Sequence, residues 1–448
     1  MKRKNKYIKF LIFCALALNF GIIATAQTTG QDDLQVQRAN PKIIDQGAQL
    51  TLDECIELTL HNNPKIAAAL YSTEAQRSRL SQTKANYLPQ VNANASYTRS
   101  DREAEQGFVG AGDSYSSSIS ATQLLYDFGK TSLTSSVQEN AYFASQEDAQ
   151  NIINNTIYSL KQAYYNVLYA KESRDVFTQS VEQYEEQLKR AKAFYDVGTR
   201  PKIDVTTAQV NLNNAKLNLI QAENALKTTS YTLLNVMGIY DSAPSFTLKT
   251  QNTIPDYQIT QEEALKTAMD TRPDLASYRL KVDSARQNVK LSQTGFAPEL
   301  NANGSYGWGG EDFPLYDRWS VGAGISVPIF SGLSTVNKVK ESKSNLKTAH
   351  ANLTDAEQSV LLDVKKAYFS FEDAKSRVPV ARLSRQQAKE NYDLAVGRYK
   401  VGVGNYIEVK DAEITYSNSK LAYIKAVFDY NLAIADLNRA MGIKNYGN

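Results

Sequence analysis

The fold of this chain follows from YKVGVGNYIEVKD, residues 399–411, and from its counterpart YDVGTRPKIDV, residues 195–205. In both stretches glycine ends a long helical pattern, and an acidic residue and valine stand where the next helix begins. Glycine just past a helix, followed by proline or a second glycine, marks a helix stop and a turn. We therefore predict two hairpins of long antiparallel helices, with tips at about 195–204 and 399–408.

Between the helices, the hydrophobic period changes from 3.6 to 2, which indicates β-strands. The clearest alternation runs from Trp319 to Ile329, where apolar residues alternate with serine and glycine. The alternation after Ser114 is weaker. We predict four strands, two in each half of the chain, at about 88–100, 114–127, 298–309 and 319–330.

The helices around the tips carry a coiled-coil pattern. After the first tip, large apolar residues recur every seven positions from Val205 to Leu233, against small residues such as Ala208 and Ala215. Large side chains facing small ones at this period are typical of knobs-into-holes packing. The long helix before the first tip spans on the order of 100 Å, and a second long helix precedes the second tip. Pro379 lies inside the second one and predicts a kink.

The exported chain is a duplication. Pro273 repeats Pro64, and Pro298 repeats Pro89, at the same spacing of 209 positions. Each half is predicted to contain a short helix, a helix, two strands, a long helix, a tip and a returning helix. The predicted segments are a signal peptide at 1–26, a flexible lead-in at 27–49, a first repeat at 50–241, a linker at 242–258 and a second repeat at 259–448.

The signal peptide has a basic start, an apolar stretch at 10–23 and a small-residue cleavage site at Ala24–Ala26. A membrane anchor is the alternative, but it needs about 20 apolar residues, and this stretch is shorter and interrupted by Asn19. Removing 1–26 removes five positive charges and no negative ones, so the formal net charge falls from +3 to −2. This charge argues against nucleic acid as a partner.

No catalytic or metal-binding pattern is visible. Cys55 is the one cysteine beyond the signal peptide, and it is predicted to be an apolar filler on a short helix. His61 and His350 lie far apart in the sequence. No nucleophile elbow, phosphate-binding loop or metal-ligand spacing occurs. We therefore predict no enzymatic activity, no cofactor and no metal.

The number of strands constrains the assembly. Strands of this length suit tilted membrane-spanning strands of about 9–11 residues. A sheet in lipid must close on itself, and bacterial barrels start at eight strands. Four strands cannot close, whereas two copies would give eight and a filled lumen, and three copies would give 12 and a pore. The heptads also require neighbouring helices, so a barrel continued by a helical tunnel is the economical arrangement.

In its order, spacing and duplication, the chain resembles the TolC-type outer membrane efflux protein family over about 50–443. The matching features are the two tips, the proline dipeptides before the strands (Leu88-Pro89 and Ala297-Pro298), and the segments YDFG at 126–129 and PIFSG at 328–332. The resemblance implies an α+β membrane protein. It would be a homotrimer whose 12-stranded β-barrel in outer membrane lipid is continued by a long periplasmic α-helical coiled-coil barrel.

The resemblance also implies a function and partners. The protein would give passive exit to substrates in a tripartite efflux or type I secretion system of a Gram-negative bacterium. Its partners would be a periplasmic adaptor (a membrane fusion protein) and an inner-membrane pump of the RND or ABC type. A periplasmic coiled-coil scaffold or adaptor without a pore is the alternative, but it has no use for four amphipathic strands. A secreted enzyme would need a catalytic constellation, which is missing.

A periplasmic gate follows from the same resemblance. In the family, acidic residues after the second tip form rings in the pore, and a tyrosine before that tip holds the coils shut. The matching positions are Glu408, Asp411 and Tyr399. Asp204 matches a carboxylate that locks the neighbouring coil, but its usual arginine partner falls at Gly404 here. The alternative for both acids is that carboxylates favour the first turn of a helix.

The hairpin tips are predicted to contact the adaptor. They are small, exposed and at the far end of the hairpins, and small residues allow close backbone approach. The alternative is that their glycines only make the turns. The predicted contact residues are Val197, Gly198, Thr199, Val401, Gly402 and Val403.

Overall fold

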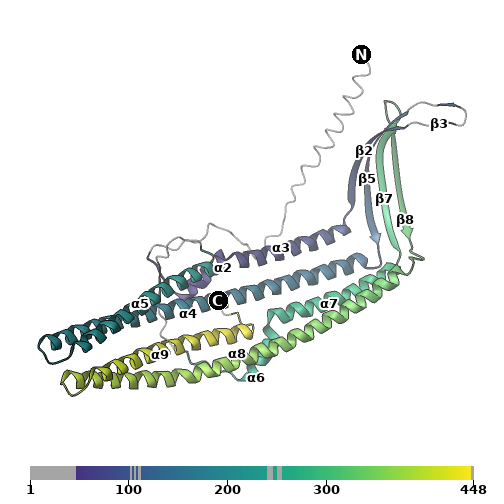
Figure 1. The fold of residues 1–448 in the computed structure, drawn as a ribbon. Helices are drawn as coiled ribbons and strands as arrows, with labels where there is room; N and C mark the ends of the chain where they lie inside the picture. Colours follow the sequence, from purple (N-terminus) through teal and green to yellow (C-terminus); the bar gives the residue numbers. More distant parts are fainter. Residues whose placement is uncertain are drawn as a thin grey trace, which may run out of the picture. The chain divides into compact units, whose positions relative to one another are not determined.

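A computed structural model describes residues 47–100, 103–104, 107–108, 112–239, 246–249 and 255–444 (Figure 1). The predicted signal peptide and residues 27–46 of the predicted lead-in lie outside the described residues. The chain divides into two compact units. The described residues of the strand unit are 74–144 and 279–351, and those of the helical unit lie in 47–73, 145–278 and 352–444.

The two halves of the chain contain the same order of main elements. In the first half these are α2 (Leu52–Asn62), α3 (Pro64–Lys84), β2 (Gln90–Ser100), β5 (Gly112–Tyr126), α4 (Lys130–Asp196) and α5 (Lys202–Met237). In the second half they are α6 (Gln261–Thr271), α7 (Pro273–Gln293), β7 (Glu299–Gly310), β8 (Tyr316–Ser326), α8 (Ser334–Lys400) and α9 (Tyr406–Ala440). The minor elements are β1 (Gln49–Leu50), β3 (Glu103–Ala104), β4 (Gly107–Phe108), β6 (Thr247–Leu248) and the 3-10 turns Ala85–Tyr87 and Thr294–Phe296.

Local signals explain where the helices begin and end. Thr51 caps α2, and the carboxylate of Glu54 accepts a hydrogen bond from the Thr51 backbone N–H, which completes a capping box. Thr260 and Glu263 repeat this arrangement at α6. Gly238 ends α5 with φ at 74°, in the left-handed region that glycine tolerates. Both long helices are confirmed, and α4 and α8 each contain 67 residues.

α8 continues through Pro379. The proline removes one hydrogen bond without ending the helix. The kink predicted at this position stays a prediction.

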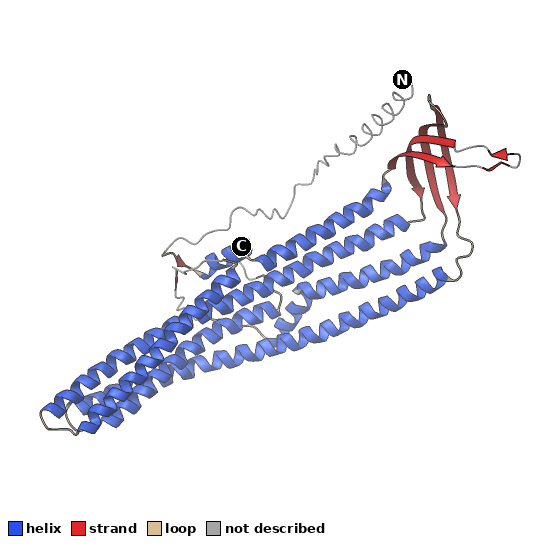
Figure 2. Cartoon of the chain, turned by 45° about the horizontal axis from the view of Figure 1, so that its top comes forward, coloured by secondary structure: helices blue, strands red, loops and turns tan. Residues whose placement is uncertain are grey.

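The strand unit contains an antiparallel sheet in the order β2-β5-β7-β8 (Figure 2, red). The central pair β5–β7 joins the two halves of the chain, with Ser117 opposite Trp308. β8 covers Tyr316–Ser326 and not 319–330, so that prediction was wrong at both ends. Pro328 has no N–H to donate to a neighbouring strand, which explains why pairing stops before it. At the other end, pairing begins after the short loop 311–315 and adds Tyr316, Asp317 and Arg318.

Large apolar side chains stand exposed on the sheet in the single chain. Trp319 is 73% exposed and Val321 is 81% exposed. Val91 and Ile119, on β2 and β5, are exposed as well. In the part of the chain that the structure describes, no helix is long and apolar enough to cross a membrane.

The helical unit has a core near each pair of short helices. One cluster includes Cys55 of α2, Tyr164 and Leu168 of α4, and Leu233 of α5. The other cluster, from α6, α8 and α9, includes Phe371 and Leu437. The structure confirms Cys55 as an apolar filler, because it is fully buried in the first cluster and burial raises the pKa of its thiol to about 12.

The heptad pattern is confirmed in the helices that return from the tips. The small residues Ala412, Ser419 and Ala426 of α9 are buried, and so are Ala208 and Ala215 of α5. Tyrosines recur every seven positions on α9, at 416, 423 and 430, and they pack between helices. Their rings contact aromatic or cationic side chains of α8, in the pairs Tyr416–Tyr392, Tyr423–Arg385 and Tyr430–Phe371.

Candidate functional site: the hairpin tips

The first tip is a tight turn between α4 and α5 in the helical unit. Gly198 has φ at 74°, and its N–H donates to the carbonyl of Tyr195 at 2.9 Å. Thr199 donates to the carbonyl of Phe194 twice, from its N–H at 3.0 Å and from its hydroxyl at 2.8 Å. These bonds satisfy carbonyls at the end of α4 that would otherwise lack partners. Pro201 then sets the start of α5.

The second tip closes in a related way. Gly402 has φ at 80°, and the carbonyl of Arg398 accepts from the N–H groups of Val403 and Gly404, at 3.1 and 3.0 Å. Asn405 caps α9, since its side-chain oxygen accepts from the N–H of Glu408 at 2.8 Å. The short side chains and the glycine keep this turn narrow.

The predicted adaptor contacts are all exposed in the single chain. Val197 is 70% exposed and Val401 is 74% exposed. A Cβ added at Gly198 or Gly402 would meet no atom of the described residues within 4 Å. Apolar surface at the end of a hairpin, with free space around it, can accept another protein segment.

Glu408 and Asp411 stand on the first two turns of α9, and both are exposed. The Nε atom of Arg398 lies 3.9 Å from an oxygen of Glu408. An exposed pair at this distance is weak, so the carboxylate remains available to ions and to other carboxylates. Asp411 makes no ion pair among the described residues.

Tyr399 and Asp204 come together where the two hairpins meet. The ring centroid of Tyr399 lies 6.4 Å from that of Phe194 on α4 and 6.5 Å from that of Tyr406. Burial raises the pKa of the Tyr399 hydroxyl, and the charges of Arg200 and Asp204 act on it from the other hairpin. The two residues predicted to hold the coils are therefore neighbours within one chain.

The sequence profile described as "Outer membrane efflux protein" matches residues 55–239 and 264–443. The chain belongs to the outer membrane efflux protein family. It is therefore an outer-membrane channel for efflux or secretion in a Gram-negative bacterium.

Named relatives cover most of this efflux protein. The outer membrane efflux protein BepC of Brucella suis is 24% identical over 371 residues, which cover 81% of this chain and 79% of BepC. The outer membrane protein TolC of Escherichia coli is 24% identical over 375 residues, 79% of this chain and 74% of TolC. The crystal structure of the CmeC outer membrane channel of Campylobacter jejuni shares the fold, with a TM-score of 0.75 and 21% identity over 87% of this chain and 85% of CmeC.

Gly404 of this efflux protein lies where the turn leaves little room for a side chain. It is buried, and a Cβ there would lie 3.0 Å from the backbone nitrogen of Tyr399 and 3.2 Å from the Cβ of Arg398. An arginine at this position would force the turn to shift. Arg398, beside Glu408, and Arg200, whose charge acts on Tyr399, place positive charge near the predicted gate. Sequence reasoning missed both arginines.

Glu413 is a further residue near the predicted gate that sequence reasoning did not single out. It lies four residues after Val409 and three before Tyr416, on the packed face of α9, and it is buried. The signal was available, because an acid on the apolar stripe of a coiled coil is unusual.

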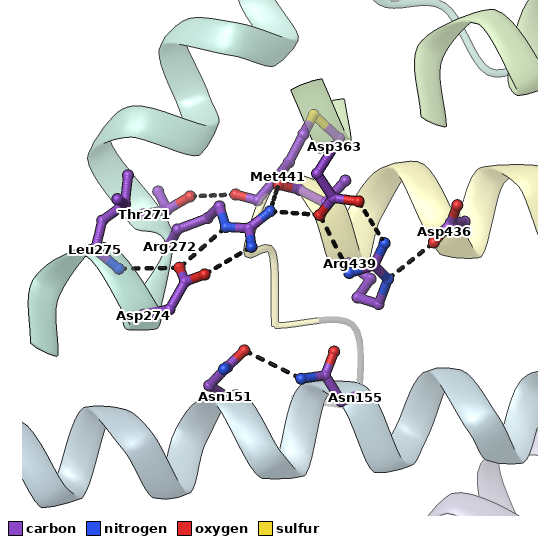
Figure 3. A network of polar contacts seen from close by, with 11 residues as sticks. Asn151, Asn155, Thr271, Arg272, Asp274, Leu275, Asp363, Asp436, Arg439 and Met441 are labelled. Atoms are coloured by element: carbon purple, nitrogen blue, oxygen red, sulfur yellow. Dashed lines mark hydrogen bonds and ion pairs between the residues drawn. The ribbon is translucent and has the colours of Figure 1, made fainter. Parts of the chain in front are cut away.

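A network of charges ties the other end of α9 to α7 and α8 in the helical unit (Figure 3). Asp363 of α8 accepts from Arg272 at 2.8 Å and from Arg439 at 3.1 Å. Arg272 also pairs with Asp274, and Arg439 with Asp436. Burial raises the pKa of Asp363, but the hydrogen bonds and charges of the two arginines outweigh burial and lower it overall.

Proposed function

We propose that this efflux protein assembles as a homotrimer and closes a 12-stranded outer-membrane barrel, continued by a periplasmic α-helical barrel. The observation that carries the proposal is the sheet β2-β5-β7-β8, whose edge strands β2 and β8 have one neighbour each among the described residues. Open edges cannot persist in lipid, where each backbone polar group must be satisfied within protein. Three copies joined edge to edge would pair every strand and enclose a pore.

The exposed apolar face supports the same assembly. Trp319, Val321 and Ile325 lie at alternate positions of β8, and each is exposed. Alternate positions point to one face of a strand. Such a face suits contact with outer membrane lipid. We also propose that the chain contains two repeats, 50–241 and 259–448. The matches of the family profile to 55–239 and 264–443 support this division.

The exit route is proposed to be passive and to belong to a tripartite efflux or type I secretion system. The chain would receive substrates from an inner-membrane pump of the RND or ABC type through a periplasmic adaptor. The exposed tips support this proposal, because Val197, Val401 and Val403 leave apolar surface uncovered at the ends of the hairpins. These residues, with Gly198, Thr199 and Gly402, would contact the adaptor.

We propose that Glu408 and Asp411 line the periplasmic aperture. Three copies would bring six carboxylates around one axis, a geometry that favours cations. Tyr399 and Asp204 would hold the coils, since both lie at the contact between hairpins. The exposure of both acids supports their access to a pore.

The test of the pore is single-channel recording in planar bilayers with the detergent-solubilised protein. We expect discrete, long-lived conductance steps that favour cations. Vesicle or bilayer insertion without any conductance would contradict the proposed function. Extraction from outer membranes that needs no detergent would favour a periplasmic scaffold instead.

A further inference from the structure

Glu413 lies on α9 where the two hairpins of the helical unit meet, and its carboxyl group contacts α4. It is 1% exposed. The side-chain nitrogen of Gln187 on α4 donates to Oε2 of Glu413 at 3.2 Å, and the hydroxyl of Tyr184 also hydrogen-bonds its carboxyl group. We call the following residues the hairpin contact: Gln179, Ser180, Tyr184 and Gln187 of α4, and Glu413, Ser417 and Lys420 of α9.

Two buried oxygen atoms in this contact have no hydrogen-bond partner among the described residues. They are Oε1 of Glu413 and Oε1 of Gln187. The amide oxygen of Gln187 can only accept hydrogen bonds, and the same holds for Oε1 of Glu413 when Glu413 is ionised. Leaving buried acceptors unsatisfied is costly, and burying an unpaired charge costs more. The missing group is therefore a donor between two side chains that already share one hydrogen bond.

We propose that Glu413 is a proton-binding site that fastens the first hairpin to the second. With a proton on Oε1, the carboxyl group donates to Oε1 of Gln187 and accepts from the nitrogen of the same amide. The O–H bond breaks when the pH rises, the proton passes to water, and the carboxylate is left buried without a counter-charge. The hairpin contact then loosens.

Among the described residues, no cation acts on the carboxyl group of Glu413. The titratable groups that face it are the hydroxyls of Tyr184 on α4, Tyr392 on α8 and Tyr406 on α9. Burial raises the pKa of all three tyrosines, so they stay neutral through the physiological range. From α5, the neutral Asn211 donates to the Tyr406 hydroxyl at 2.9 Å.

Arg190 of α4 is a cation whose charge acts on one of these tyrosines. Its charge acts on Tyr392 rather than on Glu413. Burial raises the pKa of Glu413 from 4.5 to about 7, and the hydrogen bonds from Gln187 and Tyr184 lower it only in part.

The direction of the pH effect follows from this environment. A carboxyl group whose pKa is raised by burial binds its proton more tightly when the hairpin contact is packed than when the contact is open and the group is exposed to water. The stabilisation is complete below pH 4.5, the ordinary value, and is lost as the pH rises through about 7. The opening equilibrium of the hairpin contact should therefore increase with pH, at most about 300-fold.

Among the described residues, two further side-chain hydrogen bonds join α4 to α9 in the hairpin contact. The hydroxyls of Ser180 and Ser417 lie 3.3 Å apart, and Lys420 donates to Gln179 at 2.6 Å. One buried charge can therefore dominate the local balance. The proton site stands on this chain's geometry alone, whereas its consequence, a periplasmic aperture that is tighter at low pH, rests on the proposed channel function.

Hydrogen exchange followed by mass spectrometry tests the site in the full-length detergent-solubilised protein. Wild type and Glu413→Gln are compared at the same pH over residues 180–190 and 409–420, so that the intrinsic pH dependence of exchange cancels. Glutamine carries the N–H donor that the ionised acid lacks. We expect equal exchange at pH 4.5 and, at pH 8, exchange at least about tenfold faster in wild type, consistent with the stated maximum.

Controls separate the possible outcomes. Glu182→Gln, the same change at an exposed site on α4, should behave as wild type. A ratio of wild type to Glu413→Gln that is the same at both pH values would overturn the proposal. If Glu413→Gln does not fold, infrared titration of wild type decides, and the absence of a protonated carboxyl band that disappears between pH 6 and 8 would overturn it. Burial also raises the pKa of Glu147, so its carboxyl group could contribute to the same infrared band. Glu147→Gln is the control, because a band from Glu413 should persist in this variant.

Conductance distinguishes this inference from the proposed function. If hydrogen exchange depends on Glu413 but the protein forms no pore, the proton site is supported and the proposed channel function is refuted. If the protein forms a pore but hydrogen exchange does not depend on Glu413, the channel function is supported and the proton site is refuted.

Discussion

Replacing Asp363 by alanine should weaken the helical unit through the loss of one shared anion. Asp363 accepts from both Arg272 and Arg439, and its side chain is 33% exposed. Charge-assisted hydrogen bonds contribute about 1.5–3 kcal/mol each when buried, and solvent screening reduces this at partly exposed sites. Because Arg272 keeps Asp274 and Arg439 keeps Asp436, neither arginine is left alone. We expect a loss of about 2 kcal/mol in the free energy of unfolding.

Urea denaturation followed by far-ultraviolet circular dichroism measures this loss. Asp355→Ala, on an exposed site of the same helix, is the matched control and should cost little. A double-mutant cycle with Arg439→Ala should give a coupling energy of about 1 kcal/mol or more between the two residues. Effects of the two replacements that add within about 0.5 kcal/mol would refute the shared-anion account.

The pH dependence of the same variant provides an internal check. The pKa of Asp363 is lowered, so its contribution is present above pH 3.8, its ordinary value, and is lost as the pH falls below it. Wild type and Asp363→Ala should therefore converge in stability at strongly acidic pH. A difference between them that stayed constant on acidification would count against the ion network.

Three further predictions concern turns and the gate. Gly238→Ala should destabilise the helical unit by more than the roughly 1–2 kcal/mol of left-handed strain, because the new Cβ would lie 2.5 Å from the carbonyl oxygen of Asn62. The control is Gly129→Ala, which has the same left-handed strain but free space around the new Cβ. Equal losses of stability for the two variants in urea denaturation would contradict the clash. Gly402→Leu should abolish export while assembly persists, and export at the wild-type rate in cells would argue against adaptor contact. Joint replacement of Glu408 and Asp411 by alanine should reduce cation selectivity and block by divalent cations in planar bilayers, and survival of both properties would favour the helix-start explanation.

Helix ends and tips could be predicted because their causes are local. Thr51 with Glu54, and the glycines at 198, 238 and 402, act within a few residues of their own positions. The end of β8 was missed because the alternating pattern continues past Ser326, while pairing depends on the neighbouring strand and on Pro328. Local pattern alone cannot distinguish a strand from an unpaired extended segment.

Contacts between the two halves of the chain could be identified only from the structure. The pairing of β5 with β7, and that of Glu413 with Gln187, join residues far apart in the sequence. The acid on the packed face of α9 was visible in the sequence, but its partner was not. The position of Arg398 beside Glu408 depends on how the second tip turns, which in turn depends on the lack of a side chain at Gly404.

The mass of the detergent-solubilised protein tests the central claim most directly. If three copies close one barrel, native mass spectrometry should give a complex of three mature chains that persists when detergent is exchanged. A stable single chain that still forms a conducting pore would contradict the account, because four strands cannot enclose a pore by themselves.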